Sequence, residues 1–357
     1  MKQELSPWER LEAVFAGRKP DHTPILGGWI ASPDHISAIT GISLEQYWEN
    51  PVEASIVAYE KLGTDGLIDI YVPQDKDDFR CVDEHTYQRA VIDLSINEVL
   101  ARIEDMPTPE EMERGFDFAG AYEEFRALLK TRQKQCKEMV FMPARWSAGA
   151  RITWYAEFGY ENFFTIVGLY PYHARKLLEI GGAIGRFQSQ LVAEAVREGI
   201  YPHALLLGED ICSQRGPMIS PDFMEKYYAP QLRYGLEPLL EVGCRPVWHS
   251  DGDIRPLMDM LIDCGIQGFQ GFQPECGMTL DYVIKKRTRD GDKLLIFGPL
   301  SVTTELPRCS PEEIRNKIRE AKAICESEAD LVIFTANTIN PDIPLDNIIA
   351  MYEAAKE

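Results

Sequence analysis

The residues best suited to chemistry are a histidine and an aspartate two positions apart, His249 and Asp251, in the segment Cys-Arg-Pro-Val-Trp-His-Ser-Asp-Gly-Asp. The largely apolar segment 244–248 predicts a short buried strand that ends at His249, and Gly252 lets the backbone turn after it. Parallel α/β proteins place their functional groups at such strand ends. We therefore expect His249 and Asp251 to transfer protons or bind a metal ion. The alternative is a structural histidine that only satisfies hydrogen bonds at the end of its strand.

A pair of adjacent carboxylates, Glu209 and Asp210, follows the apolar run 204–207. Adjacent side chains of an extended segment point in opposite directions, so one carboxylate should face the site and the other should face away. We expect Glu209 to face the site, as an acid–base partner of His249 or as a metal ligand together with His249 and Asp251. Asp210 could instead cap a turn and pair with Arg215.

Other polar or aromatic residues at expected strand ends are candidates for substrate binding: Trp29, Tyr71, Arg145, Gln273 and Asn337. Arg145 would bind a carboxylate or phosphate of the substrate, or would pair with Glu209. These positions include no lysine, which argues against Schiff-base chemistry. The sequence also has no phosphate-binding loop and no Gly-x-Ser-x-Gly nucleophile turn. Aromatic residues are frequent over 146–164, and we interpret them as core packing, with a substrate cage as the alternative.

The elements that must position these residues follow a regular alternation of apolar strands and helical segments. We expect strands at residues 25–26, 66–72, 139–144, 204–207, 244–248, 267–272, 293–297 and 330–334. Eight strands over about 300 residues predict an α/β fold of the (β/α)8 or TIM barrel type rather than an open sheet. Residues 79–94 predict a small β-hairpin inserted after the second strand. No repeat or linker divides residues 1–357, so we expect one domain.

Composition excludes several classes of protein. The chain has 37 Lys and Arg against 57 Asp and Glu, a formal net charge of −20, which disfavours binding to nucleic acid or to anionic membranes. Its eight cysteines form no Cys-x-x-Cys pair and no zinc-finger spacing, which indicates a reducing compartment. Neither a signal peptide nor a long apolar run is visible, so we expect a cytoplasmic protein that does not cross a membrane.

Short motifs along the whole chain resemble the uroporphyrinogen decarboxylase (URO-D) superfamily. They are Glu9-Arg10 with Lys19-Pro-Asp-x-x-Pro24, Met218-Ile-Ser-Pro221-x-Phe223 with Pro230, His249-Ser-Asp-Gly252, Gly298-Pro-Leu-Ser301, and Pro344-Leu-Asp-Asn347. The fold of this superfamily is a (β/α)8 barrel, in agreement with the strand count.

Within the superfamily, the chain is more similar to the corrinoid-dependent methyltransferases than to true uroporphyrinogen decarboxylases. The true decarboxylases carry an arginine-rich stretch, Met-Arg-Gln-Ala-Gly-Arg-Tyr, that binds the carboxylates of the substrate, whereas residues 27–33 here read Gly-Gly-Trp-Ile-Ala-Ser-Pro. Methyltransferases of this superfamily that activate a thiol bind zinc through His-x-Cys and a later Cys. The corresponding residues here are Asp251 and Asn337, so both thiolates are missing.

The resemblance implies a methyltransferase that moves a methyl group between a small methylated donor and the cobalamin of a partner corrinoid protein. A methoxylated aromatic is the favoured donor, which makes the reaction an O-demethylation. Zinc held by Glu209, His249 and Asp251 would polarise the ether oxygen, or the same residues would act as acid and base without a metal. The alternatives are a URO-D-like decarboxylase or lyase that acts on a carboxylic acid, with Arg145 on the carboxylate, and a barrel without catalytic activity.

Overall fold

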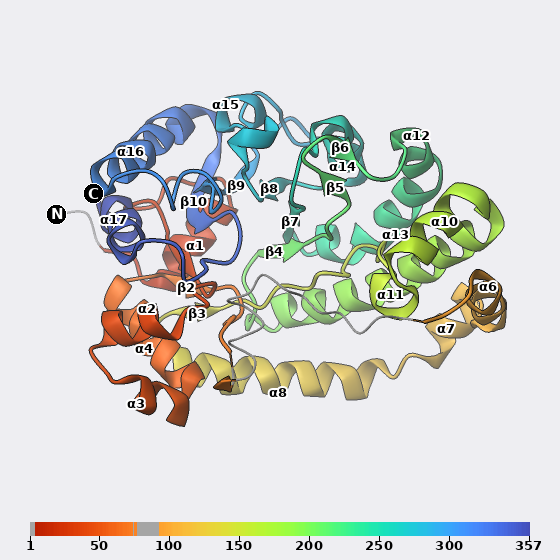
Figure 1. Cartoon of the computed structure of the whole chain (residues 1–357), viewed down its shortest axis with the longest axis horizontal. Helices are drawn as coiled ribbons and strands as arrows, with labels where there is room; N and C mark the ends of the chain where they lie inside the picture. Colours follow the sequence, from red (N-terminus) through yellow and green to blue (C-terminus); the bar gives the residue numbers. More distant parts are fainter. Residues whose placement is uncertain (1–3, 74, 77–92) are drawn as a thin grey trace.

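The computed structural model describes residues 4–73, 75–76 and 93–357, and within these ranges eight parallel strands form two sheets (Figure 1). The three-stranded sheet has the order β1 (Leu26–Gly27), β2 (Gly66–Leu67) and β3 (Val140–Phe141). The five-stranded sheet has the order β10 (Asp330–Thr335), β9 (Leu295–Leu300), β8 (Gly268–Gln270), β7 (Arg245–His249) and β4 (Ala204–Leu207). The prediction of a parallel α/β fold is confirmed.

Backbone contacts join the two sheets at both edges. Ile25, next to β1, forms a parallel bridge with Ile333 of β10. At the other edge, the amide of Arg145, beyond β3, donates to the carbonyl of Leu206 in β4 at 3.0 Å. The strands therefore follow one another in space in the order in which they occur along the chain.

Helices lie around the strands (Figure 1). They are α1 (Pro7–Phe15), α2 (Pro33–Thr40), α3 (Leu44–Glu49), α4 (Pro51–Leu62), α6 (Ile96–Asp105), α7 (Pro109–Gly115), α8 (Phe118–Cys136), α9 (Tyr155–Phe158), α10 (Tyr160–Leu169), α11 (Pro171–Arg197), α12 (Pro221–Phe223), α13 (Ala229–Glu241), α14 (Met258–Cys264), α15 (Leu280–Val283), α16 (Pro311–Glu328) and α17 (Leu345–Lys356). Capping boxes begin several of them: in α1 the Ser6 hydroxyl accepts from the amide of Glu9, and the Glu9 side chain accepts from the amide of Ser6.

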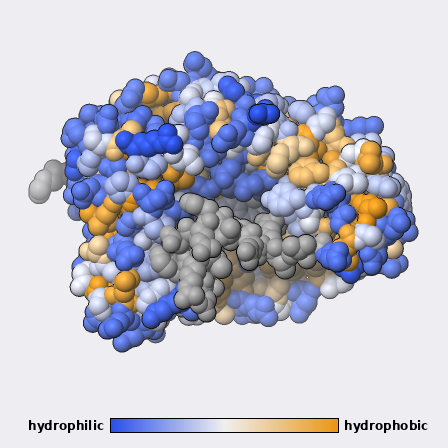
Figure 2. Space-filling model, in the orientation of Figure 1, coloured by the Kyte–Doolittle hydropathy of each residue, from blue (hydrophilic) through white to orange (hydrophobic). Residues whose placement is uncertain are grey.

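A chain of aromatic rings runs through the buried core. Phe15, at the end of α1, lies 6.2 Å from Phe297 of β9, which lies 6.4 Å from Phe334 of β10. Phe334 in turn packs against Trp29 at 4.8 Å, close to the candidate site. The strands read as continuous apolar runs because they are buried on both faces. The face of the molecule in Figure 2 is mostly hydrophilic, with apolar side chains in separate patches.

Several strands differ in bounds from the sequence prediction, among them β2, and one hairpin was not predicted. β2 ends at Leu67, although an apolar run continues to residue 72, because Asp69 has a φ of 57° and turns the backbone out of the extended region. An antiparallel hairpin that was not predicted, β5 (Cys212–Ser213) with β6 (Gly216–Pro217), follows β4. The hairpin predicted at residues 79–94 lies almost entirely outside the described residues. In the described part of the chain, no helix is long and apolar enough to span a membrane.

Candidate functional site

Three side chains meet where β4 and β7 end: Asp210, His249 and Asp251. Each offers one atom that could bind a metal ion, and these atoms all lie within 4.8 Å of one another. The Oδ1 atom of Asp210 lies 3.4 Å from Nε2 of His249 and accepts a hydrogen bond from the amide of Asp251 at 2.9 Å. The site thus has one imidazole nitrogen and two carboxylates, a set of ligands that fits a divalent cation.

His249 is buried, with 7% of its surface exposed, and is held at both ring nitrogens. Its Nδ1 is hydrogen-bonded to Oε1 of Gln270, and its Nε2 faces Asp210. Burial acts to lower the pKa of His249, but the hydrogen bond and the charge of Asp210 outweigh it, so this pKa lies above its ordinary value. The carboxylates therefore stabilise positive charge on the ring.

The Asp251 carboxylate has one satisfied oxygen and one unsatisfied oxygen. Its Oδ2 accepts from Nδ2 of Asn337 at 2.7 Å, whereas its buried Oδ1 has no hydrogen-bond partner among the described residues. Burial raises the pKa of Asp251, and the nearby Asp210 raises it further. A buried carboxylate oxygen without a donor is costly unless a cation or a proton compensates it, and this supports the fit to a metal ion.

Glu209 was expected in the metal site, but the structure places Asp210 beside His249 instead. Among the described residues, the group of possible ligands does not contain Glu209. Its Oε2 atom accepts from the amides of Ile152 and Thr153, both at 2.7 Å. The reason is Gly208, whose φ of 116° turns the chain directly after β4, so Glu209 points to the loop that follows β3. Burial raises the pKa of Glu209 to about 7.

Aromatic side chains surround the imidazole of His249. The rings of Trp146 and Trp29 lie 5.3 Å and 6.2 Å from it, both roughly edge to face. Trp29 also contacts Tyr71 at 5.4 Å, and Nε1 of Trp146 donates to the Tyr71 hydroxyl at 3.0 Å. Trp29 and Tyr71 were expected at the site, whereas Trp146 had been grouped with the aromatic residues of the core. Tyr155 and Phe163 from that group pack on each other at 5.1 Å in α9 and α10, as the core interpretation requires.

Arg145 and Gln273 lie near the strand ends but serve other contacts. The Arg145 guanidinium lies 4.1 Å above the ring of Phe125 in α8. Arg145 forms none of the ion pairs among the described residues. The alternative role of Arg145, a pair with Glu209, is therefore not formed among the described residues. Gln273 uses its Oε1 to accept from the amide of Gly252 at 2.6 Å, which holds the turn after His249. Asn337 is close to the metal-binding group, through Asp251.

Two residues of the site received no functional role from the sequence: Asp69, although it lies at an expected strand end, and Gln270. Asp69 accepts from the amide of Ala144 at 3.2 Å and from the Tyr71 hydroxyl at 3.5 Å, and burial raises its pKa to about 6. A carboxylate within an apolar run was a visible signal for it. Gln270 belongs to β8, and no property of its sequence neighbourhood marks it as the partner of a histidine.

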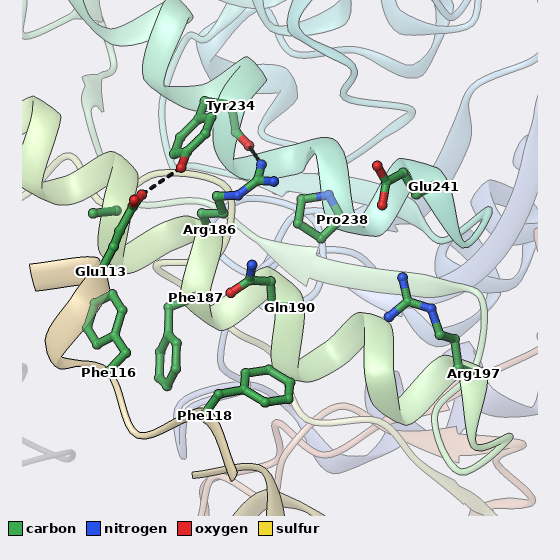
Figure 3. A pocket seen from close by; sticks show the side chains of 11 residues that line it. Glu113, Phe116, Phe118, Arg186, Phe187, Gln190, Arg197, Tyr234, Pro238 and Glu241 are labelled. Atoms are coloured by element: carbon green, nitrogen blue, oxygen red, sulfur yellow. Dashed lines mark hydrogen bonds between the residues drawn. The ribbon is translucent and has the colours of Figure 1, made fainter. Parts of the chain in front are cut away.

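A cavity of about 480 Å³ lies away from this site, between α7, α11 and α13 (Figure 3). Its arginines already have partners: Arg186 pairs with Glu237 at 2.6 Å and lies over Tyr234, and Arg197 pairs with Glu194 at 3.1 Å. We therefore place the chemistry at the strand ends.

The chain is similar to known proteins over nearly its whole length. The family described as uroporphyrinogen decarboxylase (URO-D) matches residues 6–357. No curated protein matches the sequence. A solved structure of a methyltransferase from Methanosarcina mazei is similar in fold, with a TM-score of 0.60 and 16% identity over 99% of this chain and 99% of that chain. Because the family match covers nearly the whole sequence, this chain belongs to the uroporphyrinogen decarboxylase (URO-D) family.

Proposed function

We propose that this protein is a methyltransferase that moves a methyl group between a small methylated donor and a corrinoid held by a partner protein. The observation that carries the proposal is the imidazole of His249, set between two carboxylates and under the rings of Trp29 and Trp146. The similarity in fold to a methyltransferase is in agreement with it.

We also infer that the two parallel sheets form one (β/α)8 barrel and that residues 1–357 are a single domain. The inference rests on the strand order, on the bridge between Ile25 and Ile333, and on the hydrogen bond from Arg145 to Leu206. The match to the family over residues 6–357 supports a single unit.

The donor that fits the site best is an aryl methyl ether. The rings of Trp29 and Trp146 would pack against the aromatic ring of the donor and bring its ether oxygen to His249. When the methyl group leaves with its carbon, the ether oxygen keeps the bonding electron pair and needs a proton or a positive charge. His249, whose positive charge Asp210 and Asp251 stabilise, would supply that proton.

A divalent cation would fit the same group of residues. His249, Asp210 and Asp251 would hold it, and the unsatisfied Oδ1 of Asp251 is the observation that supports this. When bound, zinc or a similar ion would act as a Lewis acid on the ether oxygen. The ligands are oxygen and nitrogen atoms without a thiolate, so the site does not suit activation of a thiol.

A carboxy-lyase is the second candidate, and Asp69 is the observation that favours it. A buried carboxyl with a pKa of about 6 could hold the proton that replaces a departing carbon dioxide. However, Arg145, which was expected to bind the substrate carboxylate, lies against Phe125.

The test is methyl transfer from 2-methoxyphenol to reduced cobalamin, followed by the absorbance of the methylated corrinoid. We expect the purified protein to accelerate this transfer and to release the free phenol. The carboxylated analogue, 3-methoxy-4-hydroxybenzoate, should be demethylated without loss of carbon dioxide. Release of carbon dioxide, with no methylated corrinoid from methoxylated aromatics, methanol or methylamines, would favour the lyase and reject the methyltransferase.

A further inference from the structure

We infer that Gln270 is a positioning residue that holds the proton of His249 on Nδ1 and presents Nε2 to Asp210 and Asp251. The inference deepens the proposed function and rests on it for the use of Nε2 at the reacting centre. It follows from the direction of three hydrogen bonds around two buried side chains.

The amide group of Gln270 can be oriented without ambiguity. Gln270 is 1% exposed, and its Nε2 lies 2.7 Å from the carbonyl of Thr335 and 2.8 Å from the carbonyl of Ala336. Carbonyl oxygens only accept hydrogen bonds, so the nitrogen of the side-chain amide must face them. Both of its hydrogens are then used, and the amide is fixed at the end of β10.

The remaining atom of the amide, Oε1, faces Nδ1 of His249. An amide oxygen carries no hydrogen, so the hydrogen of this bond must belong to Nδ1. In the neutral ring, Nε2 is therefore the atom with the free lone pair, and it is the atom that lies 3.4 Å from Oδ1 of Asp210. Hydrogen bonds of this kind, from the second ring nitrogen, set the tautomer and orientation of metal-binding histidines.

The strand register explains why these two residues meet. His249 is paired with Gln270 in the parallel ladder between β7 and β8, so both side chains project from the same face. Although β9 lies between β8 and β10 in the sheet, the Gln270 side chain reaches the carbonyls of Thr335 and Ala336 at the end of β10. Rings of Trp29 and Trp146 contact the imidazole from other directions and restrict its rotation.

The consequence concerns the charge that the site can accept. A bare Nε2 beside two carboxylates brings three electron-rich groups within 4.8 Å, and this is stable when a proton or a cation lies between them. If the neutral ring instead carried its hydrogen on Nε2, the imidazole could not bind a metal ion through that atom. Gln270 thus decides whether the group of Asp210, His249 and Asp251 can act as a metal site.

The test combines the tautomer of His249 with the affinity for zinc. Protein labelled with ¹⁵N-histidine is examined by long-range ¹H–¹⁵N NMR without metal, at a pH raised until the His249 ring is neutral, and His249 is assigned from the spectrum of His249→Ala. We expect a protonated Nδ1 and a bare Nε2 in the natural protein, with a shift of Nε2 when zinc is added. A protonated Nε2 with a bare Nδ1 would overturn the inference.

Two substitutions separate positioning from packing. Gln270→Met keeps the size but removes the acceptor, so we expect a mixture of tautomers and a loss of zinc affinity of about 10–100-fold. Gln270→Glu keeps an acceptor for Nδ1–H but loses the donors to the carbonyls of Thr335 and Ala336, so we expect it to keep the tautomer at a cost in stability. Gln190→Met is the matched control and should change neither, because Gln190 of α11 lines the cavity that lies away from the site.

Each outcome decides the inference. An unchanged tautomer and an unchanged zinc affinity in Gln270→Met would reject it, and the spectrum of the natural protein decides it even if that variant does not fold. The readouts do not depend on methyl transfer. A bare Nε2 in a protein without methyltransferase activity would therefore leave the role of Gln270 intact and reject the proposed function alone.

Discussion

The Nδ2 atom of Asn337, at the end of β10, donates a hydrogen bond to Oδ2 of Asp251, after β7, at 2.7 Å. These are the two positions at which zinc-binding members of the superfamily are expected to carry cysteine thiolates. The two positions are thus adjacent in space, although 86 residues separate them in the sequence. In this chain a carboxylate and an amide occupy them, so the site has harder ligands than a zinc–thiolate centre.

Replacing both residues by cysteine should convert the site into one that prefers zinc. For the double variant Asp251→Cys and Asn337→Cys, we expect zinc affinity to rise by about tenfold or more, or roughly 1.4 kcal/mol. The measurement is competition with a chromophoric chelator, with cobalt absorption as a report of thiolate ligation. The double variant Asp251→Ser and Asn337→Ser is the control, because it has similar size without thiolates. Equal zinc affinities in the two double variants would show that a metal does not bind at these positions.

The His249→Ala variant should lose most of its turnover while remaining folded. Loss of the general acid or of a metal ligand predicts a fall of roughly 10²–10⁴ in rate. The buried Gln270 would lose its partner at Oε1, so we also expect a loss of about 1–3 kcal/mol in the free energy of unfolding. The two effects are measured by single-turnover kinetics and by urea unfolding. Near-normal turnover of the folded variant would mean that His249 is a structural residue.

The rings of Trp29 and Trp146 beside His249 should select for donors that contain a ring. For Trp146→Ala we expect the KM for 2-methoxyphenol to rise by about tenfold, because the contacts with one face of the ring are lost. Turnover with methanol, which has no ring to contact Trp146, should change little. Steady-state kinetics with the two donors check this, and Trp146→Phe should recover part of the affinity. Parallel losses with both donors would argue for a general structural role of Trp146.

Asp69 predicts a dependence of stability on pH. Burial raises its pKa from 3.8 to about 6, so the folded protein binds this proton more tightly than the unfolded chain does. Its contribution to stability is therefore complete below about pH 4 and is lost as the pH rises to about 6, a change of roughly 2–3 kcal/mol. In Asp69→Asn this part of the pH dependence should disappear, and asparagine tolerates the φ of 57° at this position.

The measurement for Asp69 is urea unfolding of both proteins at pH 4.5 and pH 7. Glu209, whose pKa burial raises to about 7, contributes in the same direction and remains in the variant. The Asp69→Asn protein should thus keep a weaker dependence on pH rather than none. The same slope in both proteins would contradict a raised pKa at Asp69.

Local features of the sequence were sufficient to place many elements. In α16 the Ser310 hydroxyl accepts from the amide of Glu313 and the Glu313 side chain from the amide of Ser310, and this depends only on residues three apart. Residues 204–207 were predicted as a strand and form β4 with the same bounds, because the run is apolar and bounded by polar turns. The closeness of His249 and Asp251 also follows from their two-residue spacing at the end of a strand.

Tertiary structure alone decided which groups those residues face. The choice between Glu209 and Asp210 depended on the φ of Gly208, which no pattern of side chains reveals. The partnership of His249 with Gln270 depended on the register between β7 and β8, and a shift of one residue would have turned Gln270 to the other face. Composition and spacing report the preferences of each segment, whereas the site is made of contacts between segments that are distant in the sequence. Such contacts are set by packing of the whole molecule, and for this reason the chemistry of the strand ends could be predicted while its exact partners could not.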